Sequence, residues 1–94
     1  MTEPRRLVDV IFALPSADPE AVIYASAPLT PRSEAMICAE AESPTGLDYL
    51  LEVALAREVL HVWADWRHGR QPTPEQAARA VIHYAQQDAY EPVQ

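Results

Sequence analysis

Three side chains that could bind a metal ion occur at helical spacing in the second half of the chain. His61, Asp65 and His68 are separated by four and three positions, so a helix would place them on one face. Imidazole and carboxylate groups are common zinc ligands. The sequence shows no evident fourth ligand, and the spacing matches no known metal motif. The pattern therefore favours an ordinary polar helix face, and we expect neither a metal nor a cofactor.

A second candidate for chemistry is Cys38, the single cysteine of the chain. A nucleophilic cysteine needs a nearby base and electropositive surroundings. Cys38 instead lies between Glu34 and Glu40. The chain also has only two glycines, Gly46 and Gly69, which leaves no glycine-rich loop for a phosphate. The sequence thus predicts a protein that is not an enzyme.

Acidic side chains dominate the segment from residue 33 to residue 56, which contains five acidic and no basic residues. Two runs in this segment are typical of strands, and alternate residues of a strand point to the same face. One face of each strand would then carry carboxylates around an apolar side chain. On the outside of a sheet, these faces would suit a basic, partly apolar protein. The predicted partner-binding residues are Glu34, Met36, Glu40, Asp48, Leu50 and Glu52.

The overall charge limits the kinds of partner. Seven basic residues, all arginine, oppose 14 acidic residues and give a formal net charge of −7. Nucleic acids and anionic membranes are bound through clusters of Arg and Lys, so we expect neither as a partner. A basic protein partner is compatible with this charge. The alternative is a solvated acidic face that serves solubility, or an apolar centre covered by the first helix.

The elements that would position these residues follow from the hydrophobic pattern. Residues 4–14 have helical spacing, and the prolines at 15 and 19 end that helix. Short β-prone runs follow at 21–25 and 35–40. Residues 47–53 alternate, with Leu47, Tyr49, Leu51 and Val53 on one face and Asp48, Leu50 and Glu52 on the other. A helix that begins at Leu47 is the alternative interpretation of this last run.

Two helices are expected to complete the chain. Residues 54–67 carry an apolar stripe that includes Trp66, with Trp63 beside it, so we expect at least one tryptophan in the core. Thr73, Pro74 and Gln76 form a capping-box signature that begins the last helix. The order is then α-β-β-β-α-α. It predicts an α+β fold in which a small antiparallel three-stranded sheet packs on helices.

The length and composition point to one domain, residues 1–94. The longest apolar-leaning stretch is interrupted by charged residues, which argues against a membrane span. The residues after Arg5 and Arg6 do not form the apolar core of a signal peptide. A single cysteine provides no disulfide framework. We therefore expect a cytoplasmic protein.

The second half of the chain resembles a family of small, acidic, uncharacterised bacterial proteins. The resemblance is carried by Gly46-Leu47, Tyr49, Leu51 and Val53 before a helix, then by Pro72-Thr73-Pro74-Glu75, Tyr84 and Asp88-Ala89-Tyr90. It covers about half of the chain and brings no catalytic residues. In size and charge, members of that family resemble the immunity proteins that neutralise bacterial toxins. The loop after the second strand departs from the family pattern, because its only acids are Glu40 and Glu42.

These features together predict a non-enzymatic protein-binding module. The specific hypothesis is an immunity or inhibitor protein that occludes a basic partner such as a toxin. The alternative is a homodimeric structural or regulatory protein. That alternative is motivated by unpaired strand edges and by the tryptophans and valines of the helix at 54–67.

Overall fold

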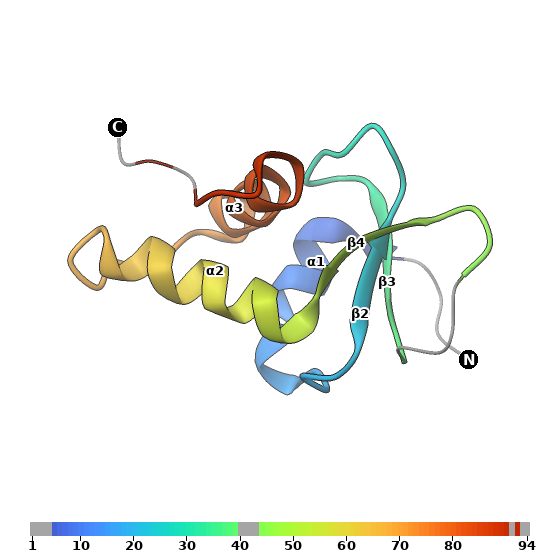
Figure 1. Cartoon of the computed structure of the whole chain (residues 1–94), viewed down its shortest axis with the longest axis horizontal. Coiled ribbons are helices and arrows are strands. Elements are labelled where there is room, and N and C mark those ends of the chain that lie inside the picture. The colour runs from blue at the N-terminus through green and yellow to red at the C-terminus, as the bar shows by residue number, and fades with distance from the viewer. Residues whose placement is uncertain (1–4, 40–43, 91, 93–94) are drawn as a thin grey trace.

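The computed structural model describes residues 5–39, 44–90 and 92. In this part of the chain, an antiparallel sheet packs on three α-helices (Figure 1). The elements in order are β1 (Arg5–Arg6), α1 (Leu7–Phe12), the 3₁₀ helix η1 (Leu14–Ser16), β2 (Val22–Ala25), β3 (Glu34–Cys38), β4 (Asp48–Glu52), α2 (Val53–Asp65) and α3 (Pro74–Gln87). The predicted α+β class is confirmed.

Among the described residues the sheet has four strands in the order β1-β3-β2-β4, so the expectation of three strands is wrong. The additional strand comes from the region predicted as helix 4–14. Arg6 is extended, with φ −73° and ψ 148°, and pairs with Glu34, while Arg5 pairs with Ala35. The helix therefore begins only at Leu7. Local periodicity did not show this strand, because two residues become a strand only through a distant partner.

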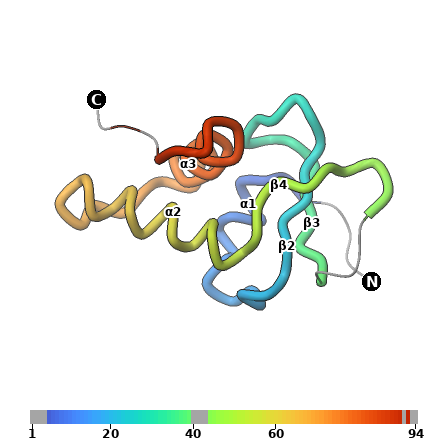
Figure 2. The backbone as a smooth tube through the Cα atoms, in the orientation of Figure 1, coloured from blue at the N-terminus to red at the C-terminus, as the bar shows by residue number. Residues whose placement is uncertain are grey.

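All three α-helices lie on one side of the sheet, as the backbone trace shows (Figure 2). Helix α1 packs against β3 and α3, and α3 packs against α1, α2 and β4. Residues that alternate along the strands face these helices and are buried, among them Ile23, Ala25 and Ala35. The alternation of β3 is as predicted, because Ala35 and Ile37 pack on the core side. The opposite side of the sheet is its outer face.

The predicted strand at 47–53 is confirmed as β4, but its predicted alternation is wrong. Leu51 pairs with Ile23, whereas Tyr49, two positions earlier, pairs with Tyr24. The register shift leaves Leu50 as an extra residue between two pairs, as in a β-bulge. Leu50 and Leu51 are both buried in the core, each 5% exposed. Leu50 therefore does not share a face with Glu52, and Tyr49 moves to the outer face.

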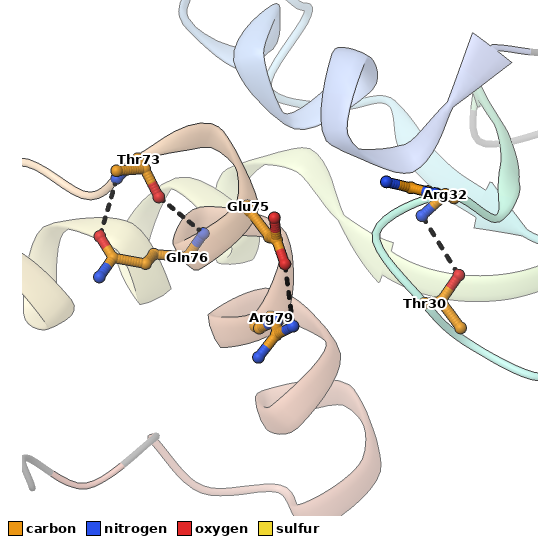
Figure 3. Close-up of polar contacts among 6 residues, drawn as sticks. All are labelled: Thr30, Arg32, Thr73, Glu75, Gln76 and Arg79. Carbon is orange, nitrogen blue, oxygen red and sulfur yellow. Dashed lines mark hydrogen bonds and ion pairs between the residues drawn. The ribbon is translucent and has the colours of Figure 1, made fainter.

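The two long helices begin and end close to where the sequence predicts. Helix α2 starts at Val53, directly after the extended residue Glu52, and the chain turns back after it through Gly69, with φ +81°. At the start of α3, the Thr73 hydroxyl accepts from the Gln76 N–H at 3.2 Å, and the Gln76 side chain accepts from the Thr73 N–H at 3.0 Å (Figure 3). The predicted capping box is thus present.

Candidate functional site

The strand register defines what the outer face of the sheet carries. Residues that pair directly across antiparallel strands project to the same side. Met36, Tyr24 and Tyr49 form one row across β3, β2 and β4, and Cys38, Val22 and Glu52 form the next row. Glu34 lies two positions before Met36, on the same side of β3. These residues are called the sheet surface below: Val22, Tyr24, Glu34, Met36, Cys38, Tyr49 and Glu52.

An aromatic pair forms the apolar centre of the sheet surface. The rings of Tyr24 and Tyr49 meet edge to face, with centroids 6.2 Å apart and an interplanar angle of 89°. Tyr24 is buried, but Tyr49 remains 58% exposed. Met36, on the other side of Tyr24, is half-buried. The exposed ring of Tyr49 thus packs on the buried ring of Tyr24, and such a supported aromatic side chain is typical of an interface anchor.

Carboxylates lie on both sides of this aromatic row. Glu34 precedes the row along β3, Glu52 follows it along β4, and both are exposed. The cation nearest in register is Arg6, which pairs with Glu34 across β1 and β3 and whose Nε lies 3.2 Å from Asp9 Oδ2. The Arg6 side chain lines a hollow with Arg32 and with Glu75 and Arg79 of α3, so it lies toward the helical side and not over the sheet surface.

The structure brings together only part of the predicted partner-binding set. Glu34, Met36 and Glu52 lie on the sheet surface, as the sequence predicts. Leu50 is buried and Asp48 pairs with Ala25, whose side chain is in the core, so the bulge removes both from this face. Glu40 lies outside the described residues. Sequence reasoning assigned Tyr49 to the core side, and no local signal distinguishes the bulged register from a regular strand.

The possible metal ligands are only partly brought together. His61 Nε2 lies 3.4 Å from Asp65 Oδ2, and both side chains are exposed on α2. His68 follows the end of α2 and has a positive φ of 59°. Among the described residues, no group of three or more His, Cys, Asp or Glu side chains could hold a metal ion. The His61–Asp65 contact is an exposed helix pair at i, i+4 spacing.

The two tryptophans of the second half have different environments. Trp63 is buried, as expected for at least one of them, and the Arg67 guanidinium lies 4.1 Å from its ring centroid. Trp66 is about half exposed and packs edge-on against Tyr90, with centroids 5.7 Å apart. Partial removal from water, with a smaller contribution from the Glu58 carboxylate, raises the pKa of Tyr90 above its ordinary value.

Comparison with known proteins identifies no relative of this chain. No protein-family model, curated protein or solved structure matches this chain. The resemblance to small acidic bacterial proteins therefore stays a prediction. No helix in the described part of the chain combines the length and the apolar character needed to cross a membrane.

Proposed function

We propose that this protein is a non-enzymatic protein-binding module whose sheet surface docks on a basic partner. The observation that carries the proposal is the exposed ring of Tyr49, packed on Tyr24 and flanked along the strands by Glu34 and Glu52. The most specific form of the proposal is an immunity or inhibitor protein that occludes the working surface of a toxin. The small size and the net charge of −7 support it.

Two kinds of side chain on the sheet surface would contribute to binding in different ways. Carboxylates at the rim steer a basic protein toward the face and raise the association rate. The ring of Tyr49 is the anchor, since a buried aromatic side chain contributes most of the energy at many interfaces. A strand surface also presents this anchor at a low entropic cost, because Tyr49 is already held against Tyr24.

Charge reversal on one face tests this proposal. Glu52→Arg places a cation on the sheet surface, whereas Glu58→Arg makes the same charge change at an exposed position of α2. Each variant is used as bait in an extract of the native host, and retained proteins are identified by mass spectrometry. The proposal predicts a basic protein that wild type and Glu58→Arg retain and that Glu52→Arg binds about tenfold more weakly. Equal retention by both variants would contradict docking through the sheet surface.

A homodimer is the second candidate function, favoured by one feature of the sheet. Strand β4 is the end strand in the described part of the chain, and Tyr49 lies on it. Pairing of two β4 strands would extend the sheet across a two-fold axis and cover both aromatic anchors. Sedimentation equilibrium at micromolar concentrations distinguishes the two functions. A dimer that Tyr49→Arg dissociates supports this second candidate, and a strict monomer excludes it.

A further inference from the structure

A groove on the helical side of the molecule is separate from the sheet surface. It lies between α1, η1, α2 and the start of α3, and its volume is about 490 Å³. This volume is within the range of sites that bind small molecules. Ile11, Leu14, Leu60 and Ala64 provide apolar lining, and Phe12 at the margin is 74% exposed.

One cation, Arg57, lines this apolar groove and is fixed in place. Its Nε and Nη2 donate to the carbonyl oxygen of Leu14 at 3.0 and 2.6 Å, and Nη2 also donates to the carbonyls of Pro15 and Ala17. These bonds hold the guanidinium plane rigidly against η1. Nη1 takes no part in them, and the described residues provide no carboxylate within ion-pair distance of Arg57.

The charge of the groove lining is opposite to that of the protein. Among the described residues that line it, Arg57 carries a formal positive charge and none is acidic, while the exposed His61 contacts Asp65 at 3.4 Å. The three carbonyls satisfy donors of this half-buried guanidinium but do not neutralise its positive charge, so an anion that reached it would be bound favourably. The rest of the lining requires that this anion carry an apolar body.

We propose that this groove binds a small apolar carboxylate, an organic acid with an acyl or aryl body. The carboxylate accepts from Nη1 of Arg57, and the hydrocarbon lies along Leu60, Ala64 and Ile11. Because Arg57 is already immobilised by three carbonyls, the ligand meets a preorganised donor. This site does not depend on the proposed function of the sheet surface.

Matched probes test the charge requirement. 1-Naphthaleneacetate and its neutral amide, 1-naphthaleneacetamide, have nearly the same shape and differ in charge. Each is titrated into the full chain at 0.15 M NaCl and followed by ¹H–¹⁵N NMR. We expect the acid to shift the amide signals of Phe12, Leu60 and Ala64 and to bind at least tenfold more tightly than the amide. Equal affinities, no binding at millimolar concentration, or shifts confined to the strands would each overturn the proposal.

Matched variants test the location. Arg57→Met removes the anchor but also the bonds to η1, so a loss of fold would mimic a loss of binding. Ala64→Trp fills the groove and leaves Arg57 in place, and Ala54→Trp adds the same ring at an exposed position of α2 outside the groove. We expect Ala64→Trp to abolish binding of the acid and Ala54→Trp to retain it. Binding that survives Ala64→Trp in a folded protein places the ligand elsewhere and contradicts the proposal.

Discussion

Tyr49 and Leu50 are neighbours in the sequence but have opposite environments. The ring of Tyr49 stands on the sheet surface against Tyr24, whereas Leu50 is buried among the helices. The bulge in β4 separates them, and it also directs Leu50 and Leu51 together into the core. A single register shift thus determines which of the two apolar side chains is exposed on the sheet surface.

This register predicts that truncation of Leu50 lowers the free energy of unfolding more than truncation of Tyr49. Leu50→Ala removes a buried side chain and should lower the free energy of unfolding by about 2–4 kcal/mol. Tyr49→Ala removes an exposed ring that packs on Tyr24 and should cost about 1 kcal/mol. Urea unfolding followed by circular dichroism measures both. A larger loss for Tyr49→Ala would mean that β4 has the regular alternation that the sequence predicts.

Arg57 joins two elements that are distant in the sequence. Its guanidinium, on α2, donates to the carbonyls of Leu14 and Pro15 in η1 and to that of Ala17 just after it. The Leu14 carbonyl also accepts from the Ala17 N–H, so the side chain adds a second donor there and supplies a donor to the carbonyls of Pro15 and Ala17.

Removal of this cation should loosen η1. Arg57→Met keeps the aliphatic stem but loses the charge-assisted bonds, and we expect a loss of about 2 kcal/mol in unfolding free energy. Amide exchange at Ala17 should accelerate more than exchange in the strands. Arg70→Met, at an exposed turn, is the control and should change neither quantity. Unchanged exchange at Ala17 in the Arg57 variant would show that η1 is held by packing alone.

Among the helices and strands, the sequence predicts those features that depend on interactions between neighbouring residues. The capping box of Thr73 and Gln76 depends on only four consecutive residues, and both of its hydrogen bonds are present in the structure. The strand β1 and the bulge opposite Ile23 and Tyr24 depend on partners elsewhere in the chain. Periodicity cannot reveal such features, because the partner strand and not the local sequence decides the register. The sequence therefore predicts carboxylates on one face of β3 and β4 around Leu50, whereas the structure buries Leu50 and exposes Tyr49 on that face.

The start of α3 offers a direct test at this scale. Thr73→Ala removes the hydroxyl that accepts from the Gln76 N–H and should destabilise the protein by about 1 kcal/mol. For a chain of this length, the melting temperature should fall by about 4–8 °C. Thr45→Ala, at an exposed turn, should change it little. Equal melting temperatures for wild type and Thr73→Ala would show that the cap contributes nothing to stability.

At the scale of the whole molecule, charge and apolar surface are distributed over two sides. The sheet surface combines exposed carboxylates with the Tyr49 ring, and the helical side contains the groove at Arg57. We therefore propose the sheet surface as the side that attracts and binds a basic protein. The groove is the side on which we propose that Arg57 binds an anion.

Electrostatic steering and the Tyr49 anchor should affect different rate constants of partner binding. Raising NaCl from about 0.05 to about 0.5 M should mainly lower the association rate, because salt screens the rim carboxylates. Tyr49→Ala should mainly raise the dissociation rate, because it removes the anchor. Surface plasmon resonance with the captured partner measures both rates. An association rate that does not respond to salt would argue against electrostatic steering.

Site-specific photo-crosslinking identifies the face of the protein that contacts a partner in the cell. The photoreactive amino acid p-benzoylphenylalanine replaces either Tyr49 on the sheet surface or Phe12 on the helical side, both of which are exposed. After irradiation in the native host, we expect a basic protein to be crosslinked from position 49 and not from position 12. Crosslinking of that protein from position 12 alone, or from neither position, would contradict the claim that the sheet surface is the docking face.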